Sequence, residues 1–269
     1  LPNSGAFAIL PQHFSQRKHR PLDRQMKESP KNRPCPKPLL LSVVAILAAS
    51  TGCNMLAGGQ NIQGVREFKA GEYIAAEQRF RTSIKTNPQN ADAHYNLAAT
   101  LHRRGIQSGD EQAISEAERL YNRCLTLNED HVECHRELAV LLVQTGRTDK
   151  SFKLLKGWVL RSPELADARV ELARLYEEFG DADTAKLHLH EALYDQSDHS
   201  RAHAALAYLQ ERSGEFQRAS ANYQQAYRQN RDPNIVNRLA RLSDYSGTSP
   251  SSSGDASAQT ASRGWSRRY

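Results

Sequence analysis

Residues 72–98 read EYIAAEQRFRTSIKTNPQNADAHYNLA, and four related stretches follow along the chain. Each has a small residue, an aromatic residue or leucine four positions later, and a closing Leu-Ala pair. The related stretches are ISEAERLYNRCLTLNEDHVECHRELA (114–139), DKSFKLLKGWVLRSPELADARVELA (149–173), ADTAKLHLHEALYDQSDHSRAHAALA (182–207) and FQRASANYQQAYRQNRDPNIVNRLA (216–240). The Leu-Ala pairs are 41, 34, 34 and 33 residues apart, and a fixed period of this length is typical of repeat proteins.

These stretches resemble the tetratricopeptide repeat (TPR), a helix–turn–helix unit of about 34 residues. Position 8 of the repeat is filled by Gly64, Ala98, Ala139, Ala173 and Ala207. Position 20 is filled by Ala76, Ala117, Ser151, Ala185 and Ala219, and position 24 by Phe80, Tyr121, Leu155, Leu189 and Tyr223. Small residues at positions 8 and 20 let the two helices cross closely. Glycines are expected to end each first helix at Gly71, Gly105, Gly146, Gly180 and Gly214.

The resemblance implies an all-α fold, a right-handed superhelical α-solenoid of about five TPR units with a C-terminal capping helix. The units are expected at residues 57–90, 91–131, 132–165, 166–199 and 200–231, with the cap at 232–245. The spacing of 41 instead of 34 predicts a seven-residue insertion, roughly IQSGDEQ, that lengthens the loop between the helices of the second unit. Position 4, where the family has Trp, holds His94, His135, Arg169 and His203. Trp158 replaces a small residue, so we expect the packing around it to open or shift.

The N-terminal stretch PLLLSVVAILAASTGC (38–53) predicts a secretory signal. Its apolar run of twelve residues, Leu39–Ser50, is shorter than the roughly 20 that cross a bilayer, and it lies between a basic segment and small residues. Cleavage after Gly52 resembles processing of a bacterial lipoprotein and implies lipidation of Cys53, although Ser50 stands where that family usually has Leu.

A start at Met26 gives the signal an ordinary length. Residues 26–52 are then the signal peptide, and 53–63 are the lipidated cysteine and a spacer. Residues 1–25 are interpreted as an upstream extension from a wrongly assigned start codon, with a genuine leader as the alternative. At the other end, the Ser-rich residues 246–269 are expected to be disordered.

The net charge of +6 does not indicate a nucleic-acid-binding protein. Residues 1–53 contribute +6, with eight Lys/Arg against two Asp/Glu, while residues 54–245 contribute −2, with 25 against 27. The tail contributes +2. Because the basic charge lies at the two ends, the repeat region offers no broad phosphate-binding face, and we expect no nucleic-acid partner.

No catalytic motif is present, so we expect no enzymatic activity, no cofactor and no small-molecule substrate. The one cluster of reactive residue types is CLTLNEDHVECH, with Cys124, His131, Cys134 and His135. Three interpretations remain open: a zinc site, which would support an enzyme, a Cys124–Cys134 disulfide, or two unpaired cysteines in the core. Cys124 occupies position 27 of the repeat, which argues against zinc because the family has a small buried residue there.

The resemblance implies that the first helices line a groove for a protein partner. The residues assigned to this groove are Phe68, Lys69, Tyr95, His102, Arg103, Arg136, Val140, Val143, Gln144, Val170, Arg174, Glu177, Tyr208, Glu211 and Arg212. Family members that bind chaperone tails hold a terminal carboxylate with a Lys/Asn/Arg clamp. The corresponding residues here are Asn61, Val65, Asn96, Glu133 and Glu137. Only Asn96 matches, and two carboxylates would repel such a ligand.

Signal, cysteine and repeats together resemble the TPR lipoproteins that assist assembly of the type IV pilus secretin. This resemblance implies a scaffold that is anchored by its N-terminal lipid in the bacterial cell envelope. Asn54, rather than Asp, after the cysteine is compatible with sorting to the periplasmic face of the outer membrane. A scaffold for polysaccharide or peptidoglycan machinery is one alternative, and a cytosolic TPR adaptor is another if the signal is spurious.

Overall fold

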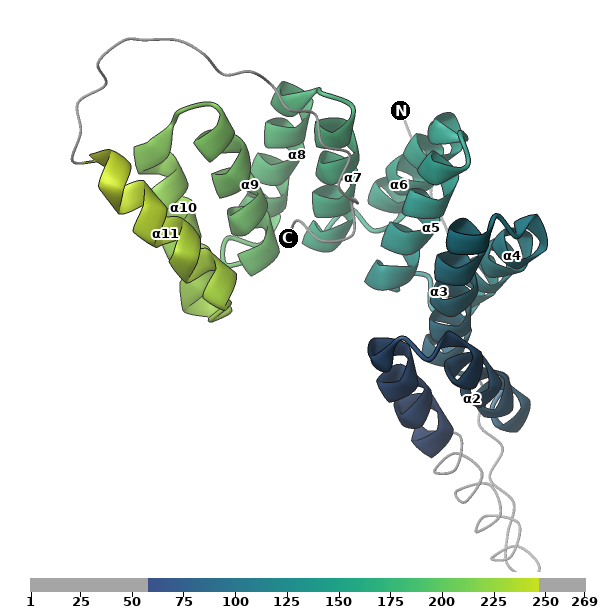
Figure 1. The fold of residues 1–269 in the computed structure, drawn as a ribbon. Helices are drawn as coiled ribbons and strands as arrows, with labels where there is room; N and C mark the ends of the chain where they lie inside the picture. Colours follow the sequence, from purple (N-terminus) through teal and green to yellow (C-terminus); the bar gives the residue numbers. More distant parts are fainter. Residues whose placement is uncertain (1–57, 247–269) are drawn as a thin grey trace, which may run out of the picture. The chain divides into compact units, whose positions relative to one another are not determined.

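The computed structural model describes residues 58–246, and every element in that range is a helix (Figure 1). A first helix is described over residues 58–70. The helices that follow are α2 (Tyr73–Thr86), α3 (Ala91–Ser108), α4 (Glu111–Leu127), α5 (Val132–Gln144), α6 (Thr148–Arg161), α7 (Ala166–Glu178), α8 (Ala182–Asp195), α9 (Ser200–Arg212), α10 (Phe216–Gln229) and α11 (Pro233–Ser246). The predicted extension, signal peptide, Cys53 and the tail beyond Ser246 lie outside the described residues.

The described helices pair into five hairpins, and the first helix of each unit packs against the second helix of the same unit. In four of the hairpins a glycine with positive φ reverses the chain where it was expected: Gly71, Gly146, Gly180 and Gly214. A left-handed residue lets the backbone amides after the helix bond back to its last carbonyls, and glycine adopts this conformation without a steric cost. The predicted all-α repeat fold is confirmed.

Close crossing of the two helices explains the small residues at positions 8 and 20. In the first hairpin, a Cβ atom added to Gly64 would lie 2.6 Å from Cε1 of Phe80. Phe80 is 1% exposed and Ala76 is fully buried. A side chain at position 64 would therefore push the two helices apart.

The second hairpin differs from the prediction, because the insertion lengthens the helices and not the loop. Gly105, predicted to end the first helix, lies inside α3, and Gly109 takes the left-handed position with φ 71°. Helix α3 has 18 residues and α4 has 17, whereas α5 has 13 and α6 has 14. Asp110 caps α4 by accepting bonds from the amides of Gln112 and Ala113.

The polar residues at position 4 bind the turn that precedes their own helix. Nε2 of His94 lies 3.0 Å from the carbonyl oxygen of Pro88, and Nε2 of His135 lies 2.8 Å from that of Glu129. His203 makes the same contact with the residue six positions earlier, and Arg169 bonds to the carbonyl of Pro163. A ring or guanidinium N–H thus satisfies a carbonyl that the helices leave free.

Trp158 is accommodated inside the core and does not open it. Its side chain is fully buried and stacks on His135, with ring centroids 3.9 Å apart and an interplanar angle of 11°. Its indole N–H donates to Oδ1 of Asp130 over 2.8 Å. His135 therefore fills space that the family's Trp at position 4 would occupy, and the large ring has moved to position 27.

Helix α11 covers the apolar side of the last hairpin, as expected for a cap. Ile235 and Leu242 are 5% and 3% exposed and pack with Tyr223 of α10. Asp232 accepts a bond from the amide of Asn234, and proline at the first helical position needs no amide partner.

Direct contacts also join the first helices of successive units, α3 to α5, α5 to α7 and α7 to α9. The first helices of these successive units therefore lie next to one another. Residues 58–63, predicted as spacer, are already helical and belong to the first helix. None of the helices in the described part of the chain has the length and apolarity needed to cross a bilayer.

Candidate functional site

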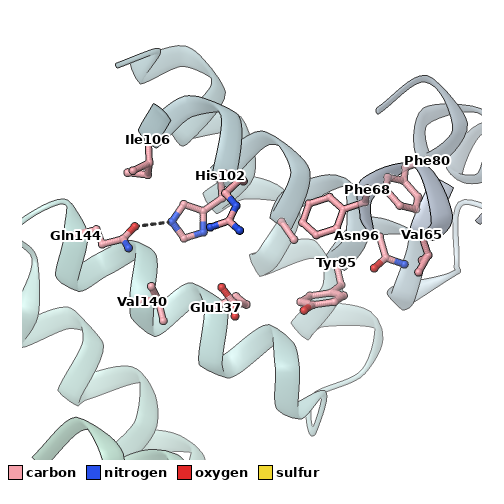
Figure 2. Close-up of a pocket in the computed structure, with 12 residues that line it drawn as sticks. Val65, Phe68, Phe80, Tyr95, Asn96, His102, Ile106, Glu137, Val140 and Gln144 are labelled. Carbon is pink, nitrogen blue, oxygen red and sulfur yellow. Dashed lines mark hydrogen bonds between the residues drawn. The ribbon is translucent and has the colours of Figure 1, made fainter. Parts of the chain in front are cut away.

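A cavity of about 260 Å³ lies where the helix of residues 58–70, α2, α3 and α5 meet, and we call it the α3–α5 pocket (Figure 2). Six of its lining residues belong to the predicted groove: Phe68, Tyr95, His102, Arg103, Val140 and Gln144. Six others were not predicted as groove residues: Val65, Phe80, Asn96, Ala99, Ile106 and Glu137. The pocket thus combines an apolar lining with a few polar groups, which is the usual composition of a binding site.

Two signals in the sequence could have identified the missing residues. Val65, Asn96 and Glu137 occupy the positions of the family's carboxylate clamp, of which only Asn96 matches the family's residues. Ile106 lies in the stretch predicted to be a loop, but the longer α3 carries it to the pocket, where it is 42% exposed. The loop prediction therefore removed one apolar residue from the expected site.

His102 joins three helices at one side of the pocket. Its Nε2 lies 2.9 Å from Oε1 of Gln144 on α5, and its Nδ1 lies 3.3 Å from the hydroxyl of Tyr121 on α4. The amide oxygen can only accept, so Nε2 carries the proton and Nδ1 accepts from the tyrosine. Burial lowers the pKa of His102, so its ring stays neutral. Its two hydrogen bonds connect α3 to α4 and to α5.

Tyr95 forms the opposite side of the pocket. Its ring packs against His131, with centroids 5.1 Å apart, and against Tyr121, with centroids 6.3 Å apart. Burial, together with the nearby carboxylates of Glu137 and Glu133, raises the pKa of Tyr95. The phenol therefore stays protonated and can donate a hydrogen bond to a ligand.

The pocket holds one carboxylate and one guanidinium. Glu137 on α5 is partly buried and Arg103 on α3 is exposed, and neither forms a hydrogen bond or ion pair with another residue of the described range. Burial raises the pKa of Glu137, and the positive charges of Arg136, Arg174 and Arg103 only partly offset this effect. A ligand group of opposite charge is therefore the natural partner of each.

Arg136 and Arg174, predicted as partner contacts, are used inside the protein. The carboxylate of Glu171 on α7 is fully buried and lies 2.6 Å from Arg136 and 3.3 Å from Arg174. Arg201 of α9 also contacts it and pairs with Asp167. Burial opposes ionisation of Glu171, yet the three guanidinium groups hold its pKa below the usual range. These residues join α5, α7 and α9 to one another.

The remaining predicted residues lie outside the pocket. Glu177 pairs with Arg212 over 3.0 Å, and Glu211 accepts from Tyr223 and pairs with Arg238. The guanidinium groups of Arg212 and Arg238 lie over the ring of Tyr208, at 5.7 and 5.0 Å from its centroid.

Three further residues of the predicted groove also lie outside the pocket. Lys69 is exposed, and Val143 is partly buried and packs against the core. Val170 is fully buried and presents no surface to a partner, contrary to the prediction.

Cys124 and Cys134 are both buried and free. Sγ of Cys134 donates to the carbonyl of Tyr121 over 3.2 Å. Contact with the thiol of Cys134, and then with His131, lowers the pKa of Cys124 to about 6, whereas burial raises the pKa of Cys134. In the described part of the chain, no three His, Cys, Asp or Glu side chains come together as a metal site.

Comparison with known proteins agrees with this architecture. Hairpins that stack through small residues, with first helices in contact, define an α-solenoid repeat protein. A family model described as TPR repeat matches residues 64–105, which include α2 and most of α3. Residues 64–105 therefore match a tetratricopeptide repeat. No curated protein sequence matches the chain.

One solved structure shows the same fold, and two others are similar structures. TTC0263, a thermophilic TPR protein of Thermus thermophilus, is 23% identical, with a TM-score of 0.53 over 69% of this chain and 98% of its own. PilF of Pseudomonas aeruginosa is 16% identical, with a TM-score of 0.48 over 73% of this chain and 88% of its own. PilW, a type IV pilus biogenesis factor, is 14% identical, with a TM-score of 0.48 over 71% and 88%.

Proposed function

We propose that this protein is a scaffold that binds a segment of a partner protein in the α3–α5 pocket. The observation that carries the proposal is the pocket itself, in which apolar and polar side chains of four helices meet. Its volume of about 260 Å³ is below the roughly 300–1,000 Å³ of typical small-molecule sites. It suits one or two side chains of a peptide, while the neighbouring first helices offer further contact area.

A site-specific crosslinking experiment tests this proposal. A photoreactive amino acid replaces Ala99 or Gln144, which line the pocket, or Tyr194 of α8, which is 89% exposed and serves as the control. After illumination of living cells, we expect positions 99 and 144 to capture the same protein and position 194 not to capture it. Identical adducts at all three positions, or none at 99 and 144, would refute the proposal.

We further propose that Cys53 carries the lipid that holds the scaffold in the bacterial cell envelope, at the periplasmic face of the outer membrane. Support comes from the order of basic segment, short apolar run, small residues and cysteine in the sequence. Cells grown with radiolabelled palmitate should label the wild-type protein and not a Cys53→Ser variant. An unlabelled wild-type protein would leave the cytosolic adaptor as the remaining interpretation.

We also propose a specific role for the scaffold, which is to assist assembly of a type IV pilus secretin. The support is the combination of signal, cysteine and repeats in one chain. Deletion of the gene should reduce the amount of assembled secretin in the outer membrane, and the wild-type gene, but not Cys53→Ser, should restore it. Unchanged secretin with altered polysaccharide or peptidoglycan would favour the alternative machinery.

A further inference from the structure

The carboxylate of Glu137 is the least satisfied charged group of the α3–α5 pocket. It is partly buried and has no hydrogen bond or ion pair with the described residues. Figure 2 shows it along the pocket with Tyr95 and Val140. A carboxylate that has lost water without gaining a partner destabilises the free protein, so a ligand cation that reaches it gains more than it would at an exposed site.

A second carboxylate and an aromatic ring strengthen the preference for a cation at this end of the pocket. Glu133 lies one helical turn before Glu137 and has a side chain that is 54% exposed. The charges of both carboxylates act on Tyr95. An aromatic face beside carboxylates suits a guanidinium or ammonium group. The cationic neighbour Arg136 is already paired with Glu171.

Arg103 is the one cation in the lining, and its positive charge opposes the binding of a cationic ligand. It is exposed and can turn toward water, whereas Glu137 is held on the pocket wall. The apolar part of the lining comes from Val65, Phe68 and Phe80, and these side chains fit an aromatic or aliphatic group. The matching ligand therefore combines an aromatic ring with one or more arginines.

The chain contains such a segment beyond the described residues. Residues 263–269 read RGWSRRY, with three arginines and two aromatic residues in seven positions. The preceding stretch, GTSPSSSGDASAQTAS at residues 247–262, has no aromatic residue and a single charge, Asp255. Cation and ring are thus concentrated in one short block.

We propose that residues 263–269 of this chain are a ligand of the α3–α5 pocket, with arginine at Glu137 and an aromatic side chain against Phe68. This inference rests on the proposed function, because it names an occupant of the same pocket. An occupant from the chain itself would compete with the partner protein and regulate the scaffold.

Fluorescence anisotropy of a labelled peptide, SRGWSRRY (262–269), with the full chain tests the proposal. We expect Glu137→Gln to weaken binding about tenfold, since a partly desolvated charge pair is lost. Arg103→Gln should leave binding unchanged or tighten it, because it removes a like charge. Glu215→Gln is the matched control and should have no effect. Glu215 precedes α10, outside the pocket, and pairs with Lys186 of α8.

Competition within the chain gives an independent measurement. A full chain with Trp265→Ser, Arg267→Ser and Arg268→Ser should bind the labelled peptide more tightly than the wild type, because its own segment no longer occupies the pocket. No binding of the peptide, or equal binding by wild type and Glu137→Gln, would overturn the inference. Weaker binding by Arg103→Gln would also overturn it and would indicate an anionic ligand. Capture of a partner at positions 99 and 144 despite these results would leave the proposed function standing.

Discussion

Replacement of Glu171 by Gln should destabilise the protein by about 3 kcal/mol. The carboxylate is fully buried and contacts three guanidinium groups, those of Arg136, Arg174 and Arg201. Removal of one partner of a buried ion pair typically costs 3–5 kcal/mol, because the remaining charge stays desolvated. The side chains of Arg136 and Arg201 are 18% and 27% exposed and can turn to water, whereas that of Arg174 is 2% exposed. We therefore expect the lower end of the range.

Urea unfolding, followed by the fluorescence of Trp158, measures this loss. Trp158 lies on α6, which packs against α5 and α7, and Trp265→Phe in every variant removes the only other tryptophan. Glu215→Gln is the control, because this carboxylate pairs with Lys186 and Arg218 close to water, and its replacement should change stability far less than that of Glu171. A loss below about 1 kcal/mol for Glu171→Gln would contradict the argument that this network stabilises the contacts between the first helices.

Further predictions concern the turn, the core and acid stability. Gly109→Ala should cost about 1 kcal/mol because φ is 71°, whereas Gly58→Ala should not, since it has ordinary φ and open space; thermal unfolding compares the two. Trp158→Ala should cost about 3–5 kcal/mol, because a fully buried ring is lost, and urea unfolding followed by far-UV circular dichroism measures it. The folded-state pKa values of Glu171 and Asp167 are lowered, so their contribution is present above the unfolded pKa of about 4 and is lost as pH falls through the folded pKa. Stability should therefore fall below about pH 5, and less steeply in Glu171→Gln; equal slopes would refute this assignment.

Part of the candidate site could be predicted because inward positions recur with the repeat. Phe68, Tyr95 and Val140 follow from their places in successive first helices, and the structure brings them to one pocket. The same rule also selected Arg136 and Arg174, which lie on the correct face but bind Glu171. Position within a repeat gives the direction of a side chain and does not reveal which charge on the next helix neutralises it.

The sequence by itself determined the repeat fold, because its requirements are local. A small residue is needed where two helices cross, and a glycine is needed where the chain must adopt positive φ. Each requirement leaves a residue at a fixed spacing, as Ala76 and Gly71 do. In the second hairpin, the repeat spacing predicted that Gly105 ends the first helix. The structure instead has the turn at Gly109, four residues later, and α3 continues to Ser108.

Only the tertiary structure decided which side chains remain available to a partner. Arg136 and Glu171 are 35 residues apart and meet because α5 and α7 pack side by side. Position 4, where the family has Trp, holds His135, and the large ring is Trp158 at position 27. The two rings stack, so their packing depends on both α5 and α6. Among residues 58–246, Glu137 has no hydrogen-bond or ion-pair partner, because the neighbouring Arg136 pairs with Glu171. Which charges are neutralised and which rings stack depends on side chains from two or more helices. The sequence pattern of one helix does not show these contacts.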